Sequence, residues 1–107
     1  MEKKYELVPD STLIISERIL HRIKALRDFG DVKAGDIGGF IECEENLSHE
    51  GNCWVYDNAM VYDAGRVFNS AKVMGLAQVF GFAQASSNSI ICDSAMIYGH
   101  AYIAYLS

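Results

Sequence analysis

The sequence predicts an all-β protein. A parallel β-helix of about three to four coils is expected over residues 37–107, after a small β-hairpin-like cap over residues 1–36. Three observations predict this fold. A β-branched residue recurs at nearly every sixth position, a Gly, Asn or Asp usually follows two positions later, and the fifth position is always small. A strict period of six matches stacked flat coils and does not match the 3.6-residue period of an α-helix.

The repeats are clearest from Val55 to the end of the chain. Written in sixes, this segment reads VYDNAM, VYDAGR, VFNSAK, VMGLAQ, VFGFAQ, ASSNSI, ICDSAM, IYGHAY and IAYLS. The first position is Val or Ile in eight of nine repeats, although these residues make up only 17 of the 107 in the chain. Because β-branched side chains suit a pleated strand and fill a narrow interior, this column is predicted to point inward.

The third and fifth positions predict the corners of the coil. Seven of nine third positions are Asn, Asp or Gly, which tolerate the left-handed backbone conformation that a sharp corner needs. All nine fifth positions are Ala, Gly or Ser, which leave room for the backbone to turn. Three six-residue faces close a triangular coil of 18 residues, so residues 18 apart are expected to stack about 4.8 Å apart.

The repeat extends weakly backwards into residues 37–54, which we interpret as a degenerate coil that starts the stack. Its first positions are Ile37, Cys43 and His49, and its fifth positions are Ile41, Leu47 and Cys53.

Residues 1–36 do not follow the period. Short strands are expected at 5–8 and 12–15, with turn signals at Pro9-Asp10 and at residues 16–18. A hairpin of residues 13–16 with 19–26 is favoured, and an amphipathic helix over 17–28 remains an alternative. The segment is expected to cap the open coil end, with a loop into the first coil at Gly30, Gly35, Gly38 and Gly39.

Charge is spread unevenly along the chain. The net charge of −5 lies entirely in residues 37–107, where only Arg66 and Lys72 oppose seven acidic residues. This balance argues against direct binding of nucleic acid, because neutralising phosphates needs a surface rich in Lys and Arg. It favours an acidic surface for a partner protein, formed by Glu42, Glu44, Glu45, Glu50, Asp57 and Asp63.

No apolar run is long enough for a signal peptide or a membrane span, so a cytoplasmic location without membrane contact is expected. The cysteines, Cys43, Cys53 and Cys92, are odd in number and match no zinc-binding spacing, so reduced thiols are expected.

One face of the predicted helix is unusually apolar on its outside. Second and sixth positions point outward, and the face that begins at Met60 presents Met60, Tyr62, Gln78, Phe80, Met96 and Tyr98. Monomers rarely leave such a patch in water, and aromatic and methionine side chains are enriched in interface cores. We therefore expect self-association through this face, as a dimer or trimer. Docking of a foreign partner and plain cross-strand packing are the alternatives.

The repeats resemble the hexapeptide-repeat family, and this resemblance implies a left-handed parallel β-helix. The strings RDFGDVKAGDIGGFIE at 27–42 and NLSHEGNCWV at 46–55 also resemble short, uncharacterised hexapeptide-repeat proteins of phages and prophages. That second resemblance implies an origin and a bacterial host cytoplasm, but no agreed activity.

Most hexapeptide-repeat relatives with known activity are acyltransferases, which use an inserted loop and a histidine base. Here the repeats run without an insertion, and His21, His49 and His100 share no 18-residue ladder on which a metal would be held. His49 is expected to be a satisfied buried or rim histidine, and the others surface residues. Neither a catalytic residue nor a metal or cofactor site is predicted.

The sequence favours a non-enzymatic, self-assembling protein that engages a host protein. An inhibitor of a host defence system such as CRISPR, acting by acidic mimicry of nucleic acid, is one form of this hypothesis. The alternatives are a binder of a nucleotide or acyl-CoA with residual acyltransferase activity, and a structural accessory protein.

Overall fold

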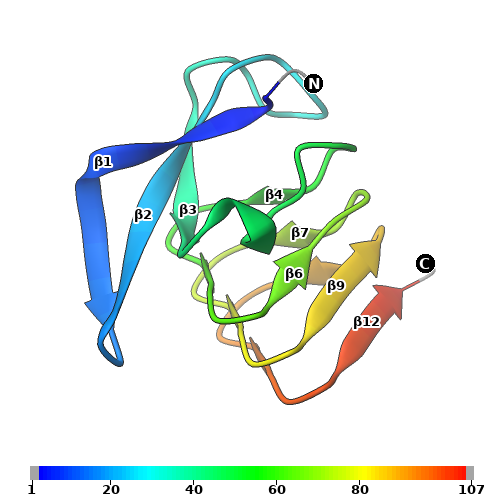
Figure 1. The fold of residues 1–107 in the computed structure, drawn as a ribbon. Coiled ribbons are helices and arrows are strands. Elements are labelled where there is room, and N and C mark those ends of the chain that lie inside the picture. The colour runs from blue at the N-terminus through cyan, green and yellow to red at the C-terminus, as the bar shows by residue number, and fades with distance from the viewer. Residues whose placement is uncertain (1–2, 106–107) are drawn as a thin grey trace.

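The computed structural model describes residues 3–105 and confirms the parallel β-helix (Figure 1). Three longer strands come first: β1 (Tyr5–Ile15), β2 (Arg18–Ala25) and β3 (Ile37–Ile41), followed by a short 3-10 helix, η1 (Glu44–Asn46). The coils then supply β4 (Trp54–Val55), β5 (Met60–Val61), β6 (Arg66–Val67), β7 (Lys72–Val73), β8 (Gln78–Val79), β9 (Gln84–Ser87), β10 (Ile90–Ile91), β11 (Met96–Ile97) and β12 (Tyr102–Tyr105).

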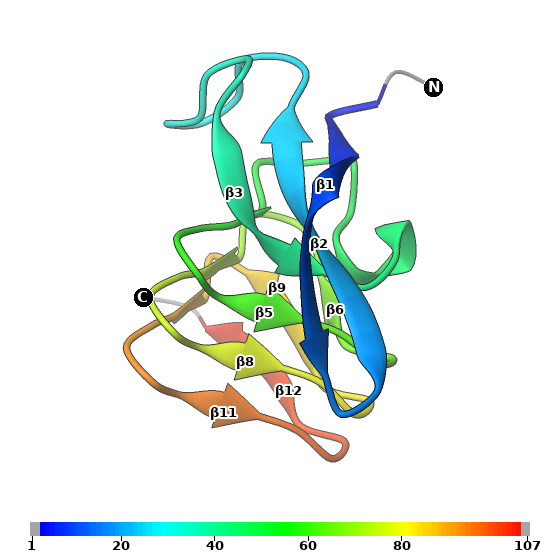
Figure 2. The ribbon, with the colours of Figure 1, turned by 90° about the vertical axis from the view of Figure 1, so that its left-hand side faces the viewer.

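The coils form three faces, each with parallel strands from successive coils. Face A contains β5, β8 and β11, face B contains β4, β7 and β10, and face C contains β6, β9 and β12. On face A the register runs from Met60 to Gln78 to Met96, a spacing of 18 residues at each step. The predicted triangular coil is therefore confirmed (Figure 2).

The corners of the coil lie where the third-position pattern predicts them. A positive φ, between 56° and 68°, occurs at Asp57, Asp63, Asn69, Gly75, Gly81, Ser87, Asp93 and Gly99. These residues are 6 apart, and each one turns the chain from one face to the next. Asn, Asp and Gly adopt this conformation at the lowest steric cost, which explains why they are frequent at the third position of the repeat.

The interior consists of the first-position column, which the repeat predicts to face inward, and of the small fifth-position residues, which are predicted only to leave room for the turn. First-position valines from Val55 to Val79 and fifth-position alanines from Ala59 to Ala83 are fully or almost fully buried. Branched and small side chains alternate along each coil, so they fill a narrow triangular interior at the density that protein cores require.

Over residues 3–36 the structure has a hairpin and no helix, which settles the alternative over residues 17–28. β1 pairs antiparallel with β2 around a tight turn at Ser16 and Glu17, both with positive φ. The expected turn at Pro9-Asp10 is wrong, because β1 continues through it. The ladder instead shifts register between Leu7 and Thr12, where residues 8–11 of β1 lie opposite Arg22 alone, so Pro9 occupies an unpaired stretch of the strand.

Gly38 and Gly39 lie inside β3 and not in the predicted loop. β3 pairs antiparallel with β2 and parallel with β5, so the hairpin and face A form one continuous sheet of six strands (Figure 2). A Cβ atom at Gly38 would lie 2.5 Å from the Val55 carbonyl oxygen, and one at Gly39 would lie 2.5 Å from that of Ala59. Glycine is required here by this close approach of backbones.

The phase predicted for residues 37–47 is wrong by two residues, whereas Cys53 lies at a fifth position as predicted. Ile41 pairs with Val61 and Leu47 with Val67, a spacing of 20, because the stretch from Leu47 to Val55 is two residues longer than the matching stretch from Val67 to Val73. Ile41 and Leu47 therefore occupy the inward column, whereas Ile37 is exposed and Cys43 is half-buried.

Lys4 closes the upper end of the β-helix. Its side chain is fully buried, and Nζ donates to the carbonyls of Cys53 at 2.7 Å and Gly51 at 3.2 Å. The ammonium also lies 4.7 Å from the centre of the Phe29 ring. Burial lowers the pKa of Lys4. Two backbone carbonyls at the upper edge of the first coil thus accept hydrogen bonds from Lys4 of the cap. Elsewhere in the helix, such carbonyls accept hydrogen bonds from the neighbouring coil.

The buried hydroxyl group of Tyr5 leads us to expect that the protein loses stability at high pH. It is fully buried, and its hydroxyl donates to the Leu47 carbonyl at 2.6 Å. Burial, with the nearby Glu44 carboxylate, raises the Tyr5 pKa far above its ordinary value. The folded state therefore retains a proton that the unfolded chain releases above about pH 10, so stability is complete below that pH. Above it, Tyr5 alone should lower the free energy of unfolding by about 1.4 kcal/mol per pH unit, in addition to a contribution from Tyr56 and Tyr62, whose pKa values burial also raises.

Urea unfolding at several pH values between neutral and alkaline measures this effect. Tyr5→Phe should lower stability at neutral pH, through the lost hydrogen bonds, and should also flatten the decline above pH 10. Tyr102→Phe, at an exposed tyrosine, is the matched control and should follow the parent at every pH. Parallel curves for the parent and Tyr5→Phe would contradict the prediction.

Candidate functional site

A ladder of three aromatic rings runs along face A. Tyr62 stacks on Phe80 with ring centres 5.1 Å apart and planes 3° from parallel, and Phe80 stacks on Tyr98 at 5.5 Å and 13°. These residues hold the second position of repeats 18 residues apart, so the coil geometry itself brings the rings into register. The ladder forms the centre of the surface that the sequence predicts to self-associate.

The N-terminal hairpin covers the upper end of this ladder. Leu20 of β2 is fully buried there and packs in a cluster with Phe40 and Tyr62, together with Leu13 and Ile15 of β1. As a result Tyr62 is only 7% exposed, although the sequence places it on the surface.

The lower end of face A stays open. Met60, Gln78 and Phe80 are half-buried, and the Gln78 side chain accepts a hydrogen bond from the Tyr62 hydroxyl at 2.8 Å. Met96 and Tyr98 are 52% and 61% exposed. The open part of the predicted interface is therefore centred on Met96 and Tyr98, and its role in self-association stays a prediction.

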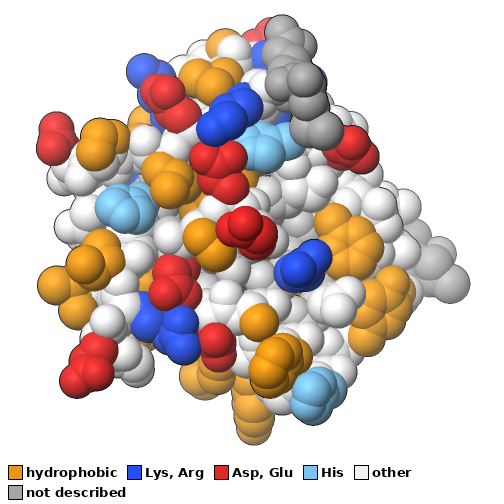
Figure 3. Space-filling view, in the orientation of Figure 1, with side chains coloured by type: hydrophobic (Ala, Val, Ile, Leu, Met, Phe, Trp, Pro, Cys, Tyr) orange, Lys and Arg blue, Asp and Glu red, His pale blue; other side chains and the backbone are white. Residues whose placement is uncertain are grey.

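The hairpin also neutralises part of the predicted acidic surface. Arg18 bonds to Glu42 at 3.0 Å and to Asp63 at 3.1 Å, an arrangement that no local sequence signal indicates. Asp57 accepts the amide of Gly75 in the next coil at 3.0 Å. Figure 3 shows acidic and basic side chains interspersed over the upper part of this side of the molecule. A role for these carboxylates in partner binding stays a prediction.

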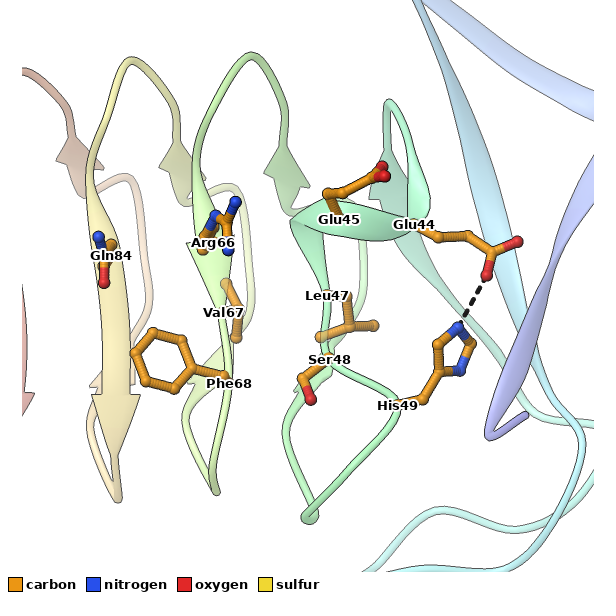
Figure 4. A pocket seen from close by; sticks show the side chains of 9 residues that line it. All are labelled: Glu44, Glu45, Leu47, Ser48, His49, Arg66, Val67, Phe68 and Gln84. Atoms are coloured by element: carbon orange, nitrogen blue, oxygen red, sulfur yellow. Dashed lines mark hydrogen bonds and ion pairs between the residues drawn. The ribbon is translucent and has the colours of Figure 1, made fainter. Parts of the chain in front are cut away.

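A groove of about 420 Å³ lies on face C, where η1 projects beside β6 and β9 (Figure 4). Sequence reasoning did not identify it, because η1 breaks the repeat. It is lined by Glu44, Glu45, Leu47, Ser48, His49, Arg66, Val67, Phe68 and Gln84.

His49 stands at the edge of this groove with both ring nitrogens engaged. The backbone amide of Lys4 donates to Nδ1 at 3.1 Å, so Nδ1 carries no proton. Nε2 therefore bears the hydrogen and donates to Oε1 of Glu44 at 2.8 Å. The ring also stacks on Tyr5 at 4.1 Å. His49 is thus a satisfied rim histidine that joins the cap to the first coil, and this geometry does not leave a nitrogen for general-base work.

Glu44 is held by two partners. The hydrogen bond from His49 and the bond from Lys3 at 3.0 Å lower the pKa of its carboxyl group. Because Glu44 is committed in this way, the free charged groups of the groove are Glu45 and Arg66. Neither forms an ion pair with another residue of the described range 3–105.

A second, smaller hollow of about 300 Å³ lies beside face B and is lined by Gly30, Asn52, Ser70, Lys72, Asn88 and Ile90. Arg66 and Lys72 are the only basic residues in 37–107, and each lines one of the two hollows. The presence of only two Lys or Arg residues in this acidic segment is the sequence signal that could have drawn attention to the two hollows.

The other histidines lie apart from the groove. His21 is on β2, opposite Ile41, and exposed His100 stacks on Phe82 at 5.0 Å. Between residues 3 and 105 no group of three or more His, Cys, Asp or Glu side chains is arranged to hold a metal ion. Within the same range, no helix has the length and apolar character to span a bilayer.

Comparison with known proteins adds one relative. Over 39 residues, 36% of this chain, the sequence is 54% identical to an uncharacterized acetyltransferase, YdcK, of Escherichia coli (strain K12). The matched segment is 12% of that protein's length. No family model matches the chain. The chain is a parallel β-helix built from six-residue repeats. Its repeats and the stacked coils establish the architecture, and the short match leaves its activity open.

Proposed function

We propose that this hexapeptide-repeat protein is a self-associating binding protein in which a second copy covers the open end of face A. The observation that supports it most strongly is the aromatic ladder. The protein's own hairpin covers its upper ring, Tyr62, and leaves its lowest ring, Tyr98, 61% exposed.

The charge distribution supports a second copy as the occupant. The six outward positions of face A carry no charged side chain, whereas the whole chain has a net charge of −5. Two copies repel each other through most of their surfaces, and face A allows contact without burying a charge. A flat, apolar and regularly spaced surface can also pack on its own symmetry mate, as the self-complementary contact of a dimer requires.

Tyr98→Glu tests this proposal. The parent should form a dimer or trimer, and the variant should dissociate at least about tenfold more readily, because a charge would be buried in the contact. Tyr102→Glu is the matched control, since Tyr102 is 59% exposed but lies on face C. Sedimentation velocity over a concentration series measures the association of all three proteins.

A parent that sediments as a monomer throughout the series would contradict the proposal. Equal weakening by Tyr98→Glu and Tyr102→Glu would contradict it as well, because it would show a general effect of added negative charge and not a contact on face A.

The finer form of the proposal is that this protein comes from a phage or prophage and binds a host protein. The target would be, for example, a nucleic-acid-binding defence protein in a bacterial cytoplasm. Its support is the resemblance of residues 27–55 to phage and prophage proteins and the acidic balance of the β-helix. Glu45 and Glu50 are exposed carboxylates that remain for such a contact.

Acyl transfer is the second candidate function. The observation that favours it is the match to a protein named as an acetyltransferase. The engaged nitrogens of His49 speak against a base in the groove of this chain. A transferase would therefore need its acid-base group from another part of the assembly.

A further inference from the structure

We propose that the groove on face C binds a free α-amino acid with an apolar side chain, with the carboxylate on Arg66 and the ammonium on Glu45. This inference does not depend on self-association, because the groove lies on face C and not on face A.

Arg66 supplies the anion-binding half of the site. Its guanidinium is exposed on β6 and has no ion-pair partner in residues 3–105. In Figure 4 it lies between Glu45 of η1 and Gln84 of β9. The planar fork of an arginine matches the two oxygens of a carboxylate, and the Gln84 amide lies on the neighbouring strand as a further donor.

Glu45 supplies the cation-binding half. Its neighbour Glu44 is bound to Lys3 and His49, whereas Glu45 is exposed and forms no ion pair with the rest of the described chain. Glu45 and Arg66 line the same groove, yet they are not within 4.0 Å of each other as a salt bridge. A ligand whose ammonium and carboxylate groups are attached to the same carbon atom can bind Glu45 and Arg66 together.

The two charges also exclude simpler ligands. A plain anion would be opposed by Glu45, and a plain cation would be opposed by Arg66. Only a molecule with separate positive and negative groups matches both sides of the groove.

The apolar part of the site comes from Phe68, which is half-buried beside Leu47 and Val67. These side chains lie below the charged row in Figure 4, so a ligand held at Arg66 and Glu45 would place its side chain over Phe68. The volume of about 420 Å³ lies near the lower end of the range for small-molecule sites, which suits a single amino acid.

Three probes test the proposal: L-phenylalanine, 3-phenylpropionate, which lacks the amine, and 2-phenylethylamine, which lacks the carboxylate. Amide chemical shifts followed by NMR during titration report the site and the affinity. L-phenylalanine should shift the amides of residues 44–49 and 66–68, and both analogues should bind at least about tenfold more weakly.

Arg66→Gln and Glu45→Gln should each weaken L-phenylalanine binding at least about tenfold. Lys72→Gln, at the other hollow, is the matched control and should leave binding unchanged. Because the three positions are at least partly exposed, each variant is expected to melt at the temperature of the parent.

Three results would overturn the proposal. One is the absence of shifts in the groove at any L-phenylalanine concentration. Another is equal binding of 3-phenylpropionate, which would show a site for anions alone. The third is unchanged affinity in Glu45→Gln.

Discussion

Val73→Asp should unfold the protein. Val73 is fully buried in the first-position column, where it lies between Val55 and Ile91 of the neighbouring coils. A carboxylate there has neither water nor a basic partner, so its burial should cost about 3–5 kcal/mol or more. Since small domains have a total stability of about 5–15 kcal/mol, most or all of the cooperative transition should disappear.

Urea unfolding followed by circular dichroism measures this loss. Lys72→Asp makes the same new side chain one residue earlier, where the position points outward and is about a third exposed. This control should retain a cooperative transition. A Val73→Asp protein that unfolds at the urea concentration of the control would contradict the inward assignment of the column.

Trp54→Ala should cause the second large loss. Trp54 holds the sixth position of the repeat that begins at His49, a position that is predicted to point outward, but the cap covers it and leaves it 2% exposed. It meets the Phe29 ring edge to face at 5.2 Å and the Tyr5 ring at 6.2 Å. Removing a buried tryptophan that joins three segments should lower the free energy of unfolding by about 3–5 kcal/mol.

Tyr102→Ala is the control for aromatic truncation, because Tyr102 is 59% exposed, and it should change stability by less than about 0.5 kcal/mol. Circular dichroism is the suitable probe, since Trp54 is the only tryptophan of the chain and its loss removes the fluorescence signal. Equal transitions for the two variants would show that the cap does not depend on Trp54.

The repeats made the coils predictable residue by residue. Each column has a separate physical requirement, so Val73, Ala77 and Gly75 all lie where the period places them. The first coil was not predictable to the same degree. Two extra residues lie between Leu47 and Val55, and a sequence of weak repeats contains no local signal for this shift.

The surfaces were harder to predict than the interior, because they depend on contacts between distant segments. The periodicity correctly placed Tyr62, Phe80 and Tyr98 in one ladder. It did not indicate that Leu20 would cover the first of them, since the path of a hairpin over a face is a tertiary property. The groove was missed for a similar reason, because it forms only where η1 lies beside β6 and β9.

The constant spacing of the ladders has a consequence for how fast the chain finds its fold. Strands on every face pair with partners 18 residues away, so each pairing closes a loop of the same modest length. Loop-closure entropy depends on that length, and each coil contacts only its neighbours. The slowest step should therefore be the packing of the first coil against the hairpin. Later coils should then be added one after another at similar rates. Folding time in such a molecule is set by the size of one turn, and lengthening the helix by further turns would change it little.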